Sequence, residues 1–165
     1  MLIRASTDAD LDAMLAIVND AARRYEGAIP ADRWHDPYMT ADALAAEIAA
    51  GVRFFVAERD GRVVGLMGIQ DRGDVALVRH AYVASGTQRG GVGTRLLRHV
   101  TALVDRPILI GTWAAATWAI DFYRRSGYTV AERSWRRHSP GCGGATDAAY
   151  AGRAANRRLA RGTGS

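Results

Sequence analysis

The stretch DVALVRHAYVASGTQRGGVGTRLLRHV, residues 74–100, carries most of the information about the fold. Its first part is rich in apolar and β-branched side chains and predicts a buried strand. Three glycines follow within residues 88–93, and Leu96, Leu97 and Val100 then recur at helical spacing. The run therefore predicts a strand, a glycine turn and an amphipathic helix that begins at the turn.

The glycine turn places little side-chain bulk at the start of the predicted helix. A helix N-terminus presents unpaired backbone N–H groups and the positive end of the helix dipole, and glycine lets the backbone approach an anion closely. Gly90, Gly91 and Gly93 therefore predict a main-chain cradle for a phosphate or pyrophosphate group, to which Arg89 adds a charge and Thr94 a hydroxyl. An ordinary turn before a helix is the alternative, because such turns are commoner than phosphate sites.

Two familiar phosphate-binding motifs are excluded. The P-loop requires a lysine after its glycines, and all 22 basic residues of this chain are arginines. The dinucleotide fingerprint requires Gly-x-Gly-x-x-Gly after an early strand, whereas residues 88–93 read Gln-x-x-Gly-x-Gly and lie late in the chain.

The rest of the chain predicts a mixed sheet with helices packed against it. Helices are expected from the Thr7–Asp10 capping pattern to Arg23, over residues 40–50 and over residues 115–125. Strands are expected at residues 2–4, 53–58, 63–70, 107–113 and 128–130, with an Asp-Gly turn between the second and the third. The order is β-α-α-β-β-β-α-β-α-β, an α/β (α+β) fold class.

Composition places the chain among ordinary globular proteins of one domain. It has 165 residues, of which 48% are hydrophobic and 24% are charged, and no apolar run reaches the ~18 residues that a membrane span needs. The N-terminus lacks the basic and apolar pattern of a secretory signal, so a cytoplasmic protein is expected. The single cysteine, Cys142, excludes an internal disulfide and a cysteine-cluster metal site, and no metal is expected.

Charge divides the chain into two parts. Residues 1–132 hold 15 arginines and 16 acidic residues, whereas residues 133–165 hold seven arginines and one aspartate, so the net charge of +5 comes from the tail. We expect residues 1–135 to form the domain and residues 136–165 to be an Arg/Ala/Gly-rich tail, disordered or loosely packed, because it has almost no large apolar residues to bury. The tail offers no apolar strand, which indicates a divergent or frame-shifted end.

The Gln-x-x-Gly-x-Gly spacing of residues 88–93 resembles motif A of the GNAT acetyltransferases, which follows the fourth strand of that fold. The segment WAIDFYRRSGY, residues 118–128, resembles a later motif of the same superfamily. The resemblance covers roughly residues 1–132 and implies a GNAT-like, mostly antiparallel mixed sheet flanked by about four helices. By the same comparison the C-terminal strand is missing, which would expose a sheet edge and leave the protein unstable or homodimeric.

The resemblance implies acetyl-CoA as co-substrate and a primary amine of a small molecule or peptide as acceptor. Ala81, Tyr82 and Val83 match the strand that holds the pantetheine arm, and one of their N–H groups would polarise the thioester carbonyl. The pyrophosphate-binding backbone of the family corresponds to Gln88, Arg89, Gly90, Gly91, Val92, Gly93 and Thr94. No membrane association and no specific nucleic-acid binding are expected.

Tyr123 and His80 are the candidate catalytic residues. Tyr123 matches the family's tyrosine beside the thioester sulfur and would protonate that sulfur as general acid. His80 could take the proton of the amine, because histidine ordinarily titrates near working pH, but a structural histidine bonded to a carbonyl is an equal alternative. In a regular strand its side chain would lie on the opposite face from those of Arg79 and Ala81. Glu58 is a weaker candidate base, since an acid at the end of a hairpin is usually solvated.

The loop between the first two predicted helices is the candidate acceptor-binding segment, because loops on a rigid scaffold often carry specificity. It is aromatic and mildly acidic, which suits a cationic amine. Core packing of the aromatic residues is the alternative. The candidate contacts are Tyr25, Glu26, Trp34 and Tyr38 from the loop, with Trp113 and Trp118 as further walls.

Two other functions fit parts of the sequence. A coenzyme A-binding module without activity would keep the cradle and lose the chemistry, and Ala116 stands where the family often has an asparagine that contacts the cofactor. A nucleic-acid-binding protein would use the arginine-rich tail, but this tail lacks interleaved aromatic residues and a recognisable recognition fold.

Overall fold

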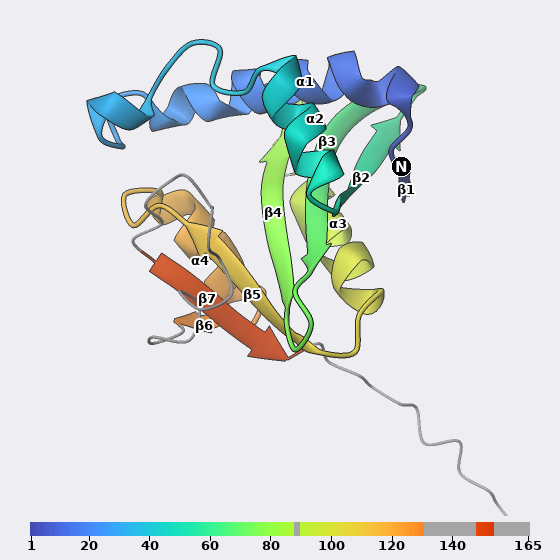
Figure 1. The fold of residues 1–165 in the computed structure, drawn as a ribbon, viewed down its shortest axis with the longest axis vertical. Coiled ribbons are helices and arrows are strands. Elements are labelled where there is room, and N and C mark those ends of the chain that lie inside the picture. Colours follow the sequence, from blue (N-terminus) through green and yellow to red (C-terminus); the bar gives the residue numbers. More distant parts are fainter. Residues whose placement is uncertain (88–89, 131–147, 154–165) are drawn as a thin grey trace, which may run out of the picture.

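The computed structural model describes residues 1–87, 90–130 and 148–153. These residues form a mixed sheet of seven strands in the order β1-β2-β3-β4-β5-β7-β6, with four α-helices around it (Figure 1). Among the described strands only β4 and β5 run parallel, so the predicted fold class, a mostly antiparallel mixed sheet flanked by helices, is confirmed. The elements are β1 (Leu2–Ala5), α1 (Leu11–Ala22), α2 (Ala41–Ala49), β2 (Val52–Arg59), β3 (Arg62–Asp71), β4 (Ala76–Val83), α3 (Val92–Ala102), β5 (Pro107–Thr112), α4 (Thr117–Arg125), β6 (Thr129–Val130) and β7 (Ala148–Arg153).

The helices cover both faces of the sheet. Met14 of α1 and Leu44 of α2 belong to one apolar cluster with Val56 of β2, whereas Leu96 of α3 belongs to another with the next residue of β2, Ala57. Successive strand residues thus enter opposite layers. Because helices cover both faces of the sheet, the sequences of β2 and β3 are nearly continuous apolar runs rather than alternating apolar and polar residues. Among the described residues, no helix is both long and apolar enough to cross a membrane.

The parallel strands β4 and β5 stay together over only a short distance. Ala76–Val78 pairs with Ile108–Ile110, and beyond these residues the two strands separate (Figure 1). At the separation β4 carries a β-bulge, because His80 and Ala81 stand opposite the single residue Met67 of β3. His80 has a left-handed φ of 52°, which is uncommon for residues with a side chain. The bulge and the separation together open the sheet beside the C-terminal half of β4.

The expectation that the C-terminal strand is missing is wrong. β7 lies between β5 and β6 and pairs antiparallel with both. Its sequence AAYAGR is poor in β-branched residues and has no alternating pattern, so its side chains give no strand signal. The backbone N–H and C=O groups along the second edge of β5 can nevertheless be paired by any strand, whatever its side chains. The rest of the predicted tail, residues 136–147 and 154–165, lies outside the described residues.

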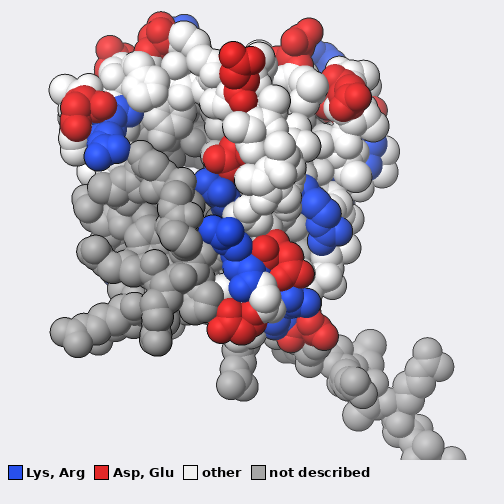
Figure 2. Space-filling view, in the orientation of Figure 1, with Lys and Arg blue, Asp and Glu red and all other residues white. Residues whose placement is uncertain are grey.

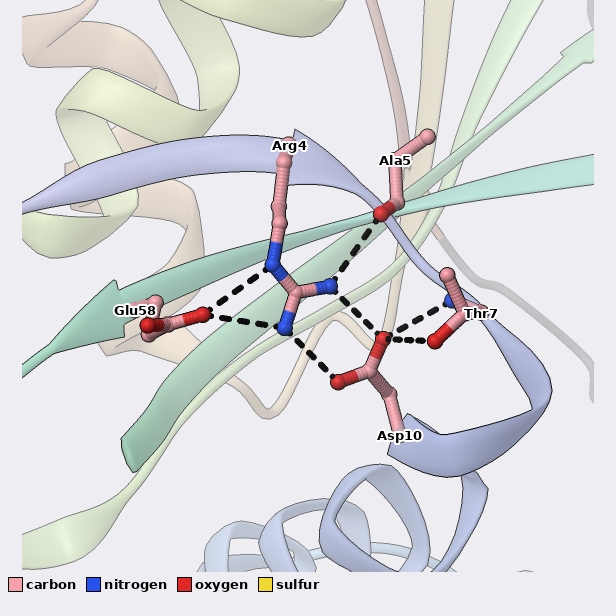
Figure 3. A network of polar contacts seen from close by, with 5 residues as sticks. All are labelled: Arg4, Ala5, Thr7, Asp10 and Glu58. Atoms are coloured by element: carbon pink, nitrogen blue, oxygen red, sulfur yellow. Dashed lines mark hydrogen bonds and ion pairs between the residues drawn. The ribbon is translucent and has the colours of Figure 1, made fainter. Parts of the chain in front are cut away.

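A buried carboxylate fastens the N-terminal strand to the first helix (Figure 3). Asp10 accepts hydrogen bonds from two nitrogens of the Arg4 guanidinium, at 2.7 and 2.9 Å, and from the backbone N–H of Thr7 at 2.8 Å. The Nε of Arg4 also donates to Glu58 at the end of β2, at 3.0 Å. The network joins β1, β2 and the entry to α1, and it leaves Glu58 paired rather than solvated.

We predict that Asp10→Asn lowers the free energy of unfolding by about 1–3 kcal/mol at neutral pH, because a charged hydrogen-bonding partner of Arg4 is lost. The hydrogen bonds from Arg4 hold the pKa of Asp10 well below its ordinary value. The carboxylate therefore stabilises the folded state fully above about pH 4, and this contribution declines as the pH falls towards the folded-state pKa.

Urea unfolding of the wild type and the variant, at neutral pH and at about pH 3, measures this difference. Asp8→Asn is the matched control, since Asp8 lies in the same turn and is exposed. Equal losses of stability in the two variants would contradict the prediction.

Candidate active site

Two cavities adjoin each other where β4 and β5 separate. The first cavity has a volume of about 660 Å³ and is lined mainly by α3, α4 and the end of β4. The second cavity, of about 400 Å³, is lined mainly by β4, β5 and the segment between α1 and α2. Their common wall consists of Tyr25, Ala81, Tyr82, Ala119 and Tyr123, which line both.

The start of α3 forms one side of the first cavity. Gly91 is the N-cap and has a φ of 72°, a left-handed conformation that favours glycine. A Cβ on Gly93 would lie 3.5 Å from the ring of Phe122 and 3.7 Å from Val83. The glycine therefore leaves space that a side chain would fill. The N-terminus of an 11-residue helix thus lies at a cavity that can accept an anion.

Arginines add positive charge around the first cavity. Arg24 and Arg125 line it, together with the single acidic residue Asp121 of the described lining. The guanidinium of Arg59, at the end of β2, would lie 3.4 Å from a Cβ on Gly90. The sequence pattern missed these arginines, because they come from three elements that only the fold brings to one place.

The turn between β4 and α3 is held by α1. Asp20 of α1 accepts a hydrogen bond of 2.9 Å from the backbone N–H of Ser85, and this bond is the main reason why the pKa of Asp20 is lowered. The hydroxyl of Thr87 donates to the carbonyl of Ala84 at 3.0 Å. These contacts fix the chain just before the glycine turn. Sequence reasoning missed Asp20, which looks like any solvated helix acid.

Tyr123 occupies the junction between the cavities. It is a buried residue of α4 and lines both, and burial raises the pKa of its phenol well above the ordinary value. The group therefore stays protonated at physiological pH and can donate a hydrogen bond. Burial also raises the pKa of Tyr82, and the neighbouring Tyr38 acts in the same direction.

Charged side chains meet inside the second cavity. Glu47 of α2 lies 3.0 Å from both His80 and Arg79, so the alternation predicted for these two neighbours is wrong. The left-handed φ of His80 in the bulge turns consecutive residues towards one carboxylate. Glu47 was not singled out by the sequence. Glu58, the weaker candidate base, is not in the described lining of either cavity.

The candidate acceptor contacts fall into three groups: those that line the second cavity, those that line neither cavity, and one that lines the first. Tyr25, Tyr38 and Trp113 line the second cavity. Trp34 lines neither cavity but packs on Tyr38, with ring centroids 5.7 Å apart. Glu26 is exposed and is not in the described lining. Trp118 lines the first cavity instead of the second, with the guanidinium of Arg24 4.4 Å from its ring centroid.

The end of the loop is fixed on α1. The side chain of Asn19 donates to the carbonyl of Met39 at 3.0 Å and accepts from its N–H at 2.9 Å. This reciprocal pair resembles the pairing of two backbone amides, and it holds the chain where it enters α2. The aromatic residues of the loop are therefore attached to the scaffold on the side of α2.

The candidate cofactor residues lie mostly together. Gln88 and Arg89 lie outside the described residues, and Gly90 adjoins Arg59. The others line the first cavity: Ala81, Tyr82, Val83, Gly91, Val92, Gly93 and Thr94.

Comparisons with known proteins point to one family. Residues 50–130 match the family described as "Acetyltransferase (GNAT) domain". No curated protein is significantly similar to the chain in sequence. The structure resembles that of the PaiA N-acetyltransferase from Thermoplasma acidophilum in complex with coenzyme A, with a TM-score of 0.72 and 15% identity over 93% of this chain and 99% of that one.

Two further solved structures show the same fold. An acetyltransferase of the GNAT family from Staphylococcus aureus Mu50 has a TM-score of 0.73 and 17% identity over 93% of this chain and 98% of that one. A ribosomal-protein-alanine N-acetyltransferase from Brucella melitensis has a TM-score of 0.60 and 26% identity over 80% of this chain and 86% of that one. Residues 50–130 thus carry a GNAT acetyltransferase domain, and the described residues have the fold of the GNAT acetyltransferases.

Proposed function

We propose that this enzyme transfers the acetyl group of acetyl-CoA to a primary amine of a small molecule or peptide by direct attack on the thioester. The observation that carries the proposal is the common wall of the two cavities. A donor in the first cavity and an acceptor in the second would meet at Ala81, Tyr82 and Tyr123. Two substrates held in contact need no covalent enzyme intermediate.

The first cavity fits coenzyme A. Gly91 and Gly93 leave the start of α3 open to a pyrophosphate, and Arg24, Arg59 and Arg125 supply positive charge for the phosphates. Beyond Val78 the described part of β5 does not pair with β4. The edge of β4 that faces away from β3 is therefore open at Ala81 and Tyr82 to hydrogen bonds from the pantetheine arm. When bound, acetyl-CoA supplies the acetyl thioester that the amine attacks.

The residues where the two cavities meet would stabilise the developing negative charge and transfer protons. A backbone N–H among Ala81–Val83 would stabilise the negative charge that develops on the carbonyl oxygen. Tyr123 would donate to the departing sulfur from a phenol that stays protonated. An ammonium with a pKa near ~10 must lose its proton before it can attack. His80, which lines the acceptor side, is the group that would take a proton there.

The second cavity supports a small primary amine or a peptide N-terminus as acceptor. Its described lining combines the aromatic rings of Tyr25, Tyr38 and Trp113 with charged groups of both signs. Aromatic faces can hold the apolar part of an acceptor or a second cationic group. The ribosomal-protein-alanine N-acetyltransferase with the same fold supports the inclusion of peptide N-termini.

The alternative functions predict different properties. A coenzyme A-binding module without activity would not need a lined second cavity beside the thioester position. A nucleic-acid-binding protein would need a continuous basic surface, whereas the described residues on the face in Figure 2 carry acidic and basic side chains side by side. Both observations favour acetyl transfer.

We predict that the enzyme releases free thiol from acetyl-CoA only when a suitable acceptor is present. The measurement is a thiol-release screen over small amines, amino acids and peptide N-termini, with mass spectrometry of the acetylated product. A chain that binds acetyl-CoA but releases no thiol with any acceptor would contradict the proposed function and support the binding module.

We predict that Gly91→Val weakens coenzyme A binding about tenfold or more. A valine at the left-handed φ of 72° is strained, and relaxing that strain would disturb the N–H groups at the start of α3. Calorimetry of the folded variant measures the affinity. Gly73→Val is the matched control, because Gly73 also has a positive φ and open space around its Cβ position, but it lies in the turn between β3 and β4. Equal affinities of the two variants would contradict the assignment.

We predict that Tyr123→Phe lowers turnover by about 10²–10⁴ while coenzyme A affinity is kept, because only the proton donor is removed. The loss should shrink with a thioester whose leaving group needs no protonation. Tyr128→Phe is the control, since the ring of Tyr128 packs on Tyr123 with centroids 6.3 Å apart. Full turnover of Tyr123→Phe would move the acid role to another group and leave acetyl transfer standing.

A further inference from the structure

Glu47 forms a compact charged cluster with two consecutive residues of β4. Its Oε2 lies 3.0 Å from His80 Nε2 and 3.0 Å from Arg79 Nη1, while Arg79 Nη2 donates to Oε1 at 3.1 Å. Glu47 Oε2 and His80 Nε2 are shielded from solvent, and neither makes a well-aligned hydrogen bond among the described residues. A hydrogen on Nε2 that is aimed at the carboxylate would satisfy both atoms.

The cluster is anchored on three sides. Arg79 also donates to Gln70 Oε1 at 3.3 Å, and Gln70 in turn donates to the carbonyl of Ala50 at 2.7 Å. The ring of Phe54 lies 5.7 Å from that of His80. Strand β3, strand β2 and the end of α2 therefore hold the arginine, the imidazole and the carboxylate in one arrangement.

Glu47 is ionised in this arrangement. Burial acts to raise the pKa of Glu47, but the interaction with His80 and the charge of Arg79 outweigh it, so the pKa is lowered. The charged groups that face the imidazole are this carboxylate and the Arg79 guanidinium. Asp32, Arg33 and His35 are the other titratable side chains of the loop that line the cavity.

We propose that Glu47 is the positioning residue for His80 in the acyl transfer. This inference rests on the proposed function. Glu47 accepts the hydrogen of Nε2 and so fixes the imidazole tautomer in which Nδ1 carries the free electron pair. The proton of the attacking amine passes to Nδ1, the imidazolium keeps its Nε2–H bond to Glu47, and Glu47 stays ionised throughout. Arg79 keeps the carboxylate charged and in place.

The experiment compares Glu47→Gln with the wild type by two independent readouts. The first is the tautomer of the His80 imidazole, read from the NMR chemical shifts of its two ring nitrogens, which needs no acceptor. In the wild type the hydrogen should lie on Nε2, and in Glu47→Gln, whose amide can itself donate to Nε2, a substantial share of it should move to Nδ1. The second is acceptor-dependent thiol release across a range of pH, whose plateau should be about tenfold or more lower.

Controls separate positioning from stability. Asp42→Asn removes an exposed carboxylate from the same helix and should change neither readout. Glu47→Asp keeps the charge and should restore part of the wild-type profile. His80→Asn tolerates the left-handed φ and should abolish the pH-dependent step while coenzyme A affinity is unchanged.

The outcomes divide clearly. An unchanged tautomer of His80 in Glu47→Gln, or unchanged thiol release with only a loss of stability, would overturn the positioning role. Full activity of His80→Asn would overturn it as well. A wild type that is inactive with every acceptor would refute the proposed function instead, and the chemical shifts of the ring nitrogens would still decide whether Glu47 controls the proton on His80.

Discussion

β4 and β5 are hydrogen-bonded to each other only from Ala76 to Val78, and the rest of the site depends on their separation beyond that point. Two parallel strands that stayed paired would close the sheet and leave no free edge on β4. The separation instead leaves room for one cavity on the side of α3 and α4 and another on the side of the loop between α1 and α2. The β-bulge at His80 and Ala81 marks the place on β4 where they part.

The separated strands are held in place by elements that pack around them. α3 packs so closely on β3 that a Cβ on Gly65 would lie 2.9 Å from Val92 and 3.2 Å from the carbonyl of Tyr82. Asp20 holds the start of the glycine turn through Ser85. β7 covers the second edge of β5. The strands can therefore diverge at one end without loss of backbone pairing elsewhere.

The two cavities also differ in the charged side chains that line them. The first cavity is edged by arginines, as a site for phosphates requires. In the second cavity, Glu47 and Arg79 compensate each other beside His80, so a neutral amine would not meet an unbalanced charge. Tyr123 stands between the two as a protonated phenol. The two cavities thus differ in electrostatic character although they share a wall.

Much of this arrangement could be predicted from the sequence, because the glycine turn and the Phe122-Tyr123 pair carry local signals. The helix start at Gly91 needs only turn chemistry and helical periodicity, whereas the role of Tyr123 is implied by the resemblance to the GNAT acetyltransferases. Other features depend on tertiary contacts. β7 has no side-chain pattern and exists through backbone pairing. The bulge reverses the expected alternation at Arg79 and His80, and Glu47 is far from both in sequence. None of these has a periodic signal to detect.

The most direct test of the central claim is a crystal structure of the enzyme with coenzyme A. We predict that the pantetheine arm lies along β4 beside Ala81 and Tyr82, on the side that faces away from β3. Its sulfur should lie at the common wall of the two cavities, within hydrogen-bonding distance of the Tyr123 hydroxyl. A coenzyme A molecule whose sulfur lies away from Tyr123, or β4 and β5 paired throughout in the complex, would contradict this account.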